Sequence, residues 1–427
     1  MTFTQNRDFR YIIFILFGLI VGYFIGIYVT MYLPTVTVQN SQNIISNEEI
    51  FLTDKIKKSM NIIRKYSYGF EQKSTIEIED AVLKSVVDGL GDKHSTYFTK
   101  KETEEFEEAL RGDFEGIGAV INDNPRGIKI MKIIAGSPAE KAGLKAGDIM
   151  TKVGDVNIVG KTTEEAVKSI RGPKGTIANI TYKRGEDNTE LFVSVTRDKV
   201  NVPSVGEKML DKKIGYIEIA TFGEHTGPEF VKSWNNLVSS GAQGIILDFR
   251  NNGGGYLDTA IELASVIFPK NTPIVTIKEN DPKNTDTKYT SAFSKINITM
   301  PIIVLINDYS ASASEIFAGA VQDHGRGILL GEKSYGKGSV QEPFDLGDGS
   351  IMKITTARWY TPKDKSIDIK GITPDVYVVL TNKDYDSIFD RQLEAAKVIM
   401  NDQITSKMGI PDIKEKYKSN NFTELKK

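Results

Sequence analysis

The chain has 427 residues, 40 % of them hydrophobic, and carries 54 lysines and arginines against 56 aspartates and glutamates. This length accommodates about two to four domains, and a formal net charge of −2 without a basic block excludes a typical nucleic-acid-binding protein. The absence of cysteine excludes disulfides, thiolate catalysis and thiolate metal sites. The three histidines, His94, His225 and His324, are scattered, so we expect no metal site, no cofactor and no Ser-His-Asp triad.

The first 34 residues predict a membrane anchor. Residues 11–33 are apolar and uncharged, and a helix of this length, at about 1.5 Å per residue, crosses roughly 30 Å of hydrocarbon. Arg7 and Arg10 precede the segment, which places the start of the chain in the cytoplasm. No small-residue cleavage motif follows, so we expect a retained single-pass anchor in the cell membrane, with everything after Pro34 on the extracytoplasmic side.

A helical region is expected to follow the anchor. Residues 39–43 are polar and predict a linker, whereas residues 48–110 place apolar side chains such as Ile56 and Met60 at helical spacing. We therefore assign residues 35–112 to a linker and a helical N-terminal region.

Residues 113–198 carry the motifs of a separate module. A glycine-rich start is followed by a second run of glycines and small residues at 135–148, and together they resemble a PDZ domain. In that family the glycine-rich loop presents backbone N–H groups to the terminal carboxylate of a peptide, which adds to the sheet as a strand. The resemblance implies protein or peptide partners with exposed apolar C-termini. The residues expected to bind the peptide in this loop are Gly116, Ile117, Gly118 and Ala119.

Arg171 ends the helix that is expected to form the far wall of this groove, at residues 162–170. The helix dipole favours a cation at that end, so Arg171 fits an ordinary C-terminal cap. The alternative is that Arg171 reaches the bound tail or the following domain and couples peptide capture to activity. Both interpretations stay open on the sequence alone.

Residues 199–382 alternate short apolar strands with helices, which indicates an α/β domain. The polar segment 279–297 has no apolar period and is interpreted either as a loop near the cleft or as a surface insertion. The charged segment 383–427 is expected to be helical. Within the α/β domain we expect strands at 213–221, 245–249, 273–278 and 301–306, and helices at 228–239, at 257–268 and after Ser312.

A serine lies at the corner between a strand and the helix that follows it. Residues 302–306 predict a buried strand and residues 316–321 a buried helix, so Ser312 lies between them. A helix start exposes unpaired N–H groups, and an oxyanion that forms beside Ser312 would meet donors such as the Ala313 N–H. The corner therefore suits acyl transfer. Ser312 with Glu315 also matches an S-x-x-E capping box, so a purely structural serine is the alternative.

A lysine flanked by glycines follows this helix. A neutral lysine accepts the proton of a serine only if burial lowers its pKa from about 10.4 toward about 7 to 8. Gly336 and Gly338 allow the backbone at Lys337 to approach the corner closely. Gln341 is expected to hold the neutral amine, but four residues of straight strand span roughly 13 Å, so this contact needs a bend or bulge. The sequence thus predicts a serine–lysine hydrolase with Ser312, Lys337 and Gln341.

Two other interpretations of this region are disfavoured. Residues 331–337 fit the first seven positions of a phosphate-binding loop, but the eighth should be Ser or Thr and is Gly338. His324 is close enough in sequence to Ser312 to be considered as its base. We expect it instead to satisfy carbonyl groups at the end of its helix, before Gly325.

An earlier turn is rich in glycine. Residues 244–249 predict a strand, and Asn251, Asn252 and three glycines separate it from the apolar segment 257–268, which leaves backbone amides free. Taken alone, this turn also fits an ordinary tight strand-to-helix connection.

Three motifs in this order resemble the carboxyl-terminal processing proteases, also called tail-specific proteases. They are residues 248–255, 310–315 and 331–341. The resemblance implies a ClpP/crotonase-like α/β core, in which Ser312 is the nucleophile, Lys337 the general base and Gln341 the side chain that orients the lysine. It also implies that the flanking helical segments assist formation of a homodimer.

The same resemblance implies an oxyanion hole, formed by the Ala313 N–H and a glycine N–H of the earlier turn. We select Gly254 for this role, while Gly253 and Gly255 are not excluded. Many family members have proline where this chain has Gly253, and this departure leaves the amides available.

We therefore expect a membrane-anchored serine endopeptidase that recognises C-terminal tails through its PDZ domain and cleaves proteins through an acyl-enzyme. The alternative is a PDZ scaffold whose protease core has lost activity, against which the intact Ser312, Lys337 and Gln341 argue. The expected domains are the anchor at 1–34, the helical region at 35–112, the PDZ domain at 113–198, the protease core at 199–382 and the C-terminal helical segment at 383–427.

Overall fold

The computed structural model describes residues 47–68, 74–185, 189–279, 286–292, 299–382, 384, 389–419 and 422–425. The anchor that we predict at residues 1–34 lies outside the described residues. Among the helices that the structure describes, none combines the length and the apolar character that a membrane crossing needs. The chain divides into two compact units, residues 1–78 and 79–427.

The N-terminal region is helical, as its apolar spacing predicts. It contains α2 (Asn47–Tyr66), α3 (Thr75–Asp88) and α4 (Lys100–Arg111). A complete capping box begins α4, because Thr99 and Glu102 exchange side-chain and backbone hydrogen bonds.

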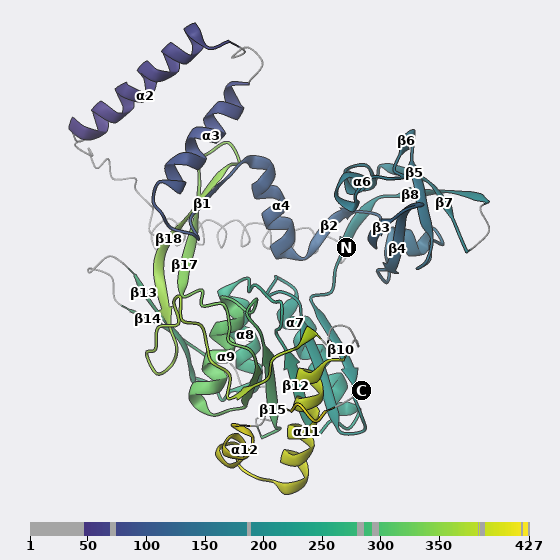
Figure 1. Cartoon of the computed structure of the whole chain (residues 1–427), viewed down its shortest axis with the longest axis vertical. Helices are drawn as coiled ribbons and strands as arrows, with labels where there is room; N and C mark the ends of the chain where they lie inside the picture. Colours follow the sequence, from purple (N-terminus) through teal and green to yellow (C-terminus); the bar gives the residue numbers. More distant parts are fainter. Residues whose placement is uncertain are drawn as a thin grey trace, which may run out of the picture. The chain divides into compact units, whose positions relative to one another are not determined.

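The segment with the PDZ motifs forms a small β-rich body (Figure 1). Its sheet has the strand order β3-β4-β5-β7-β8, and β6 (Val156–Asn157) pairs with β5. β2 (Asp113–Gly116) pairs with β9 (Asp198–Asn201) where the chain enters and leaves. The remaining elements are β3 (Ala119–Asn124), β4 (Gly127–Ile133), α5 (Pro138–Lys141), β5 (Ile149–Val153), α6 (Thr163–Ile170), β7 (Ile177–Lys183) and β8 (Glu190–Thr196).

A second sheet of six strands forms the centre of the α/β domain. Its strand order is β10-β11-β12-β15-β16-β19, parallel except for the antiparallel pair β10 and β11. β11, β12 and β15 agree closely with strands expected from the sequence, whereas β10, β16 and β19 were not predicted. They are β10 (Val205–Met209), β11 (Ile214–Ile219), β12 (Gly244–Asp248), β15 (Ile302–Ile306), β16 (Ile328–Gly331) and β19 (Val376–Tyr377).

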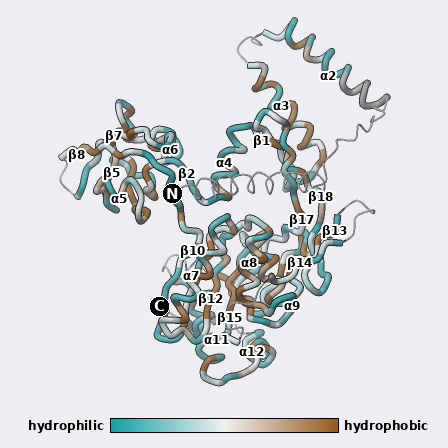
Figure 2. The backbone as a smooth tube through the Cα atoms, turned by 180° about the vertical axis from the view of Figure 1, so that it is seen from behind, coloured by the Kyte–Doolittle hydropathy of each residue, from teal (hydrophilic) through white to brown (hydrophobic). Residues whose placement is uncertain are grey.

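Helices cover both faces of this sheet (Figure 1). In β12, Ile245 and Leu247 pack with α7 (Thr226–Ser239), α8 (Leu257–Ile267) and α9 (Ala313–His324). Ile246, on the opposite face, packs with the C-terminal helices α11 (Arg391–Ser406) and α12 (Ile410–Tyr417). Burial on both faces explains why these strands are continuous apolar runs, and Figure 2 shows the hydrophobic segments gathered around α8, β12 and β15.

A third sheet lies beside the α/β layers and contains elements that we did not predict. Its order is β1-β18-β13-β14, and β17 pairs with β18. β14 falls within the polar segment 279–297, which the sequence indicated as loop; its Thr and Tyr residues suit a strand once β13 provides a partner. The strands are β1 (Thr96–Phe98), β13 (Pro273–Glu279), β14 (Thr287–Thr290), β17 (Ser339–Asp345) and β18 (Ile351–Tyr360).

Candidate active site

Ser312 lies where the sequence places it, in the corner between β15 and α9. The serines on either side of it are fully buried and hold this corner against the turn after β12. The Ser310 hydroxyl donates to the Phe249 carbonyl oxygen at 2.8 Å, and the Ser314 hydroxyl donates to the Asn252 carbonyl oxygen at 2.9 Å. The outer two serines, Ser310 and Ser314, therefore fix the backbone that carries Ser312.

The backbone of Ser312 is strained. Its φ of 55° and ψ of −115° lie outside the regions that a non-glycine residue prefers, and such a conformation costs about 1 to 3 kcal/mol. Glu315 supports it by accepting the Ser312 N–H at 2.9 Å. The Ser312 hydroxyl makes no capping hydrogen bond to α9, and the Glu315 N–H donates to the Ser312 carbonyl oxygen at 2.8 Å. The capping interpretation thus explains Glu315 but not the serine hydroxyl.

The Glu315 carboxylate also binds the loop that carries the lysine. It is 1 % exposed, and it accepts hydrogen bonds from the Ser334 hydroxyl at 2.5 Å, the Gly336 N–H at 2.7 Å and the Lys337 N–H at 2.9 Å. Burial raises the pKa of this carboxyl group, while the four hydrogen bonds it accepts oppose that rise. One side chain therefore joins the backbones of Ser312 and Lys337, a role that the S-x-x-E pattern alone did not reveal.

Lys337 is half-buried beside this corner. Its carbonyl oxygen accepts the indole N–H of Trp359 at 2.9 Å. Gly336 has a φ of 92°, and a Cβ there would lie 2.7 Å from the Gly371 nitrogen, so only glycine fits. Burial lowers the pKa of the Lys337 ammonium, against the carboxylates of Glu315 and Asp92, which raise it. The direction agrees with what a general base needs.

Gln341 lies on β17, next to an irregularity in its pairing with β18 at Val340. Its amide nitrogen donates to the Ser339 hydroxyl at 2.7 Å and to the Thr355 hydroxyl at 3.2 Å. Among the described residues no hydrogen bond joins Gln341 to the Lys337 ammonium, although both side chains line one pocket. The bulge that the predicted contact requires is present, and the two hydroxyls orient the carboxamide.

The pocket that Lys337 and Gln341 line has a volume of about 450 Å³ and is mainly apolar. It brings together Ser312, Lys337 and Gln341, although α9, β16 and a loop separate Ser312 from the other two in sequence. Phe106 and Leu110 of α4 also line it. The sequence did not predict this contribution from α4, because an amphipathic helix does not reveal which surface it covers.

The turn after β12 packs directly on the serine corner. A Cβ added to Gly254 would lie 2.8 Å from the Ser312 Cβ and 2.9 Å from the Ala313 nitrogen. The Gly254 N–H donates to the Asn252 side chain at 2.9 Å, whereas the N–H groups of Gly253, Gly255 and Ala313 have no acceptor among the described residues. An oxyanion donor needs a free N–H, which Ala313, Gly253 and Gly255 have among the described residues, and the choice among the three glycines stays a prediction.

Neither disfavoured interpretation fits the geometry. His324 lies at the opposite end of the 12-residue helix from Ser312 and contacts the Pro273 carbonyl oxygen at 2.7 Å. The amides of Gly336 and Lys337, which a phosphate would need, donate to Glu315. A strand, β17, follows this loop, whereas a phosphate-binding loop continues into a helix.

The 116–119 loop leads into β3, an edge strand of the described sheet. Gly118, with a φ of 80°, packs so closely on Ser137 that a Cβ would lie 2.3 Å from the serine Cβ. Ile117 is buried, and Ala119 begins β3. Within the described sheet β3 pairs on one side only, with β4, and so offers an edge for an added strand.

Arg171 points to α4. Its guanidinium lies 3.2 Å from the Glu108 carboxylate and stacks at 4.9 Å over the Phe114 ring. It is also the C-terminal cap residue of α6. The structure thus combines the cap with a contact to the helix that contributes Phe106 and Leu110 to the pocket.

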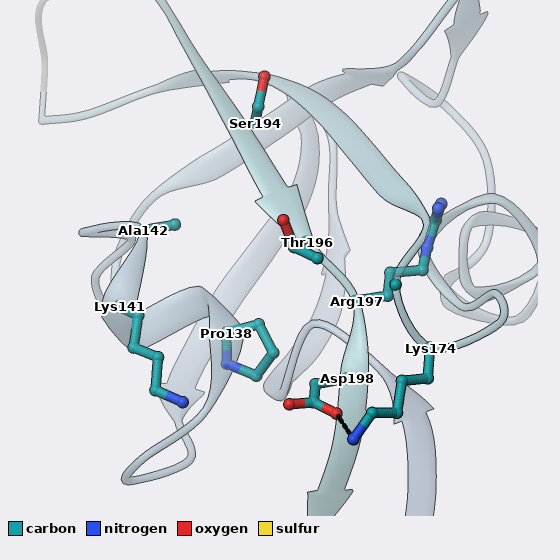
Figure 3. A pocket seen from close by; sticks show the side chains of 9 residues that line it. Pro138, Lys141, Ala142, Lys174, Ser194, Thr196, Arg197 and Asp198 are labelled. Carbon is teal, nitrogen blue, oxygen red and sulfur yellow. Dashed lines mark ion pairs between the residues drawn. The ribbon is translucent and has the colours of Figure 1, made fainter.

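Another hollow of the PDZ body lies away from this groove (Figure 3). Pro138, Lys141, Ser194 and Thr196 are among the residues that line it, and none of the lining residues belongs to the 116–119 loop or to α6. Its Lys174 and Asp198 form an ion pair at 2.7 Å. The hollow therefore presents a charge pair that is already satisfied.

Comparison with known proteins agrees with this geometry. A profile described as "Peptidase family S41" matches residues 213–378, and a PDZ domain profile matches residues 129–184. A "Probable CtpA-like serine protease" of Staphylococcus haemolyticus is 36 % identical over 309 residues, which are 72 % of this chain and 62 % of the relative. The "Carboxy-terminal processing protease CtpA" of Bacillus subtilis is 36 % identical over 324 residues, 76 % of this chain and 68 % of the relative.

A crystal structure of a putative S41 protease from Bacteroides fragilis has the same fold. It superimposes with a TM-score of 0.52 over 75 % of this chain and 90 % of that chain, at 19 % identity. The chain therefore belongs to peptidase family S41 and is a serine peptidase that carries a PDZ domain. The resemblance to the carboxyl-terminal processing proteases, and the α/β core with a PDZ domain, are thereby confirmed.

Proposed function

We propose that this chain is a membrane-anchored carboxyl-terminal processing peptidase that works through a Ser312–Lys337 dyad and an acyl-enzyme. One observation carries the proposal: the strained Ser312 and the half-buried Lys337 line one pocket, and Glu315 hydrogen-bonds to the backbone of both.

The proposed reaction uses these positions. Neutral Lys337 removes the Ser312 proton as Oγ attacks the substrate carbonyl carbon. The oxyanion that forms accepts hydrogen bonds from the N–H of Ala313 and from a glycine N–H of the 253–255 turn. Lys337 then returns the proton to the leaving amine, which gives the acyl-enzyme. A water molecule that loses its proton to Lys337 then attacks the ester carbonyl carbon, and Lys337 passes the proton to Oγ as the bond to the acyl group breaks, which releases the acid product and restores Ser312.

The PDZ groove between β3 and α6 selects the substrates in this proposal. It takes proteins with exposed apolar C-termini, whose terminal carboxylate meets the amides of the 116–119 loop. The apolar run at 11–33 anchors the chain in the cell membrane with the peptidase outside, and the flanking helices support a homodimer. Arg171 stays the predicted link between bound tail and pocket, through Glu108 on α4.

Cleavage by the full chain in detergent tests the dyad. The substrates are an unfolded protein and a peptide with an apolar tail, and the variants are Ser312→Ala and Lys337→Ala. Both variants should lose at least about 10³-fold in kcat, because nucleophile and base act as one unit. Lys333→Ala, an exposed lysine of the same loop, serves as the matched control and should retain full activity.

A serine-reactive phosphonate separates the peptidase from a PDZ scaffold. It should label the native chain at Ser312 and leave Ser312→Ala unlabelled. A folded native chain that binds the apolar tail but resists the probe and cuts nothing would support the scaffold and refute the proposed activity.

A further inference from the structure

The pocket beside Ser312 contains a second lysine that the proposed mechanism does not use. Lys353 lies on β18, where its backbone pairs with Thr96 of β1 on one side and with Pro343 of β17 on the other. Its side chain lines the same pocket as Ser312 and Lys337. Strand pairing on both sides holds the root of this side chain on a rigid element.

Lys353 is a half-buried cation, and no carboxylate of the described part of the chain pairs with it. Its ammonium lies over the rings of Phe98 at 5.1 Å and Phe106 at 4.9 Å. Among the described residues it forms no ion pair, whereas Arg250, Arg391 and Lys414 each contact an aspartate. Burial, together with the charge of Lys337, lowers the pKa of Lys353. The two aromatic faces offset only part of the free-energy cost of burying the Lys353 ammonium.

The rest of the pocket determines what can reach this ammonium. Most of the lining is apolar, with Leu110, Ile316 and Trp359 among its walls. A group that enters beside Ser312 therefore gains by burying a hydrocarbon stem and by ending in an anion near Lys353. A carboxylate is the group in polypeptides with this chemistry.

We propose that Lys353 forms a carboxylate-binding subsite inside the peptidase pocket, which favours peptides that place an acidic side chain or a free C-terminal carboxylate close to the cleaved bond. This inference rests on the proposed function and adds a substrate class to it. The bound carboxylate supplies a counter-ion that the described residues do not, while Phe98 and Phe106 flank the charge pair.

The test uses the full chain and matched peptides that differ only near the cleaved bond. Glutamate and its neutral isostere glutamine are compared at each position from three residues before the bond to three residues after it. Each peptide is made as the free acid and as the C-terminal amide. The native chain should show kcat/KM about 10- to 100-fold higher for the preferred carboxylate, as expected of a charge-assisted hydrogen bond in a shielded site.

Three variants isolate the charge. Lys353→Met keeps an unbranched stem between the rings and should abolish the preference while it still cleaves the glutamine amide. Lys353→Arg should retain the preference, and Lys363→Met, an exposed lysine outside the pocket, should change nothing. Because the PDZ loop is also expected to take a terminal carboxylate, only the part of the preference that Lys353→Met removes is assigned to the subsite.

The four kinds of peptide distinguish an acidic side chain from a C-terminal carboxylate as the group that Lys353 binds. A glutamate preference that persists in amidated peptides assigns the side chain, and a preference for the free acid whatever the side chain assigns the terminus. Equal ratios in the native chain and in Lys353→Met overturn the subsite. So does a native chain without preference, even if Lys353→Met fails to fold.

Binding to Ser312→Ala, measured in parallel by fluorescence anisotropy, separates this inference from the proposed function. A chain that cuts without preference refutes the subsite alone. A chain that binds the acidic peptide more tightly through Lys353 but cuts nothing refutes the proposed activity and keeps the subsite.

Discussion

The Glu315 carboxylate receives hydrogen bonds from Ser312, Ser334, Gly336 and Lys337 in a position almost closed to water. Each of its oxygens accepts two hydrogen bonds, and one oxygen accepts those from the proposed nucleophile Ser312 and the proposed base Lys337. A buried carboxylate whose hydrogen bonds are all satisfied holds the groups that donate to it in fixed positions. Glu315 is thus a positioning residue of the peptidase.

Glu315→Gln should therefore lower kcat more than it raises KM. The amide presents an NH₂ group to donors that need an acceptor, which costs about 1 to 3 kcal/mol and corresponds to a loss of roughly 10- to 100-fold if it displaces the dyad. Urea unfolding measures the loss of folding stability, and steady-state kinetics measures the changes in kcat and KM. Glu342→Gln, on the exposed side of β17, is the control, and equal kinetics in both variants would contradict the positioning role.

The pH dependence of kcat should report Lys337. Burial holds the pKa of this lysine below its ordinary 10.5, and only the neutral amine accepts the serine proton. Activity should thus be low on the acid side and rise with pH through an apparent pKa below 10.5. A flat profile from about pH 6 to about pH 10, with the chemical step shown to limit the rate, would refute Lys337 as base.

At the scale of elements, the site depends on how closely the β12–α8 turn approaches the start of α9. Gly254 has a φ of 102° and no room for a side chain, whereas a Cβ added to Gly253 would meet no described atom within 4 Å. A side chain is therefore accommodated at position 253 but not at position 254.

Gly254→Ala should displace the Ser312 corner and lower kcat/KM by at least about 100-fold, because a misplacement near 1 Å costs about that much. Gly253→Ala should keep most of the activity, since it leaves the backbone N–H in place. Cleavage assays on both variants, with circular dichroism to verify folding, make the comparison. Similar activity in the two would show that the close approach has no catalytic consequence.

At the scale of the whole molecule, Asp92 organises the loop that precedes β1 and joins it to β18. It accepts the N–H groups of His94 and Ser95 and the Ser95 hydroxyl, and Ser95 in turn accepts the Thr355 N–H of β18. Burial opposes the ionised form of Asp92, but these hydrogen bonds outweigh it and lower the pKa to about 2 from 3.8. A carboxylate more acidic in the folded than in the unfolded chain stabilises the fold when ionised.

This contribution should be present above about pH 4 and lost as the pH falls toward about 2. Thermal unfolding of the native chain and of Asp92→Asn should show a difference in Tm that is largest near neutral pH and shrinks across this window. Because the other carboxyl groups titrate in both chains, the difference isolates Asp92. A constant difference from pH 6 to pH 2 would contradict the assignment.

Much of the fold was predictable because the signals are local. The apolar runs of β12 and β15 are buried on both faces, and the helix starts and the Ser312 corner follow from adjacent residues. The β14 strand was not predictable, since its polar residues form a strand only against β13.

The sequence by itself determined the family and the strand–helix alternation and predicted Ser312 and Lys337 as the dyad, because each depends on a pattern within a few positions. Only the tertiary structure decided that Glu315 joins the two backbones and that α4 lines the pocket. It likewise decided that Lys353 enters the pocket without an ion pair to any described carboxylate. These features join segments far apart in the chain, and no local periodicity encodes which distant surfaces meet when the sheets close.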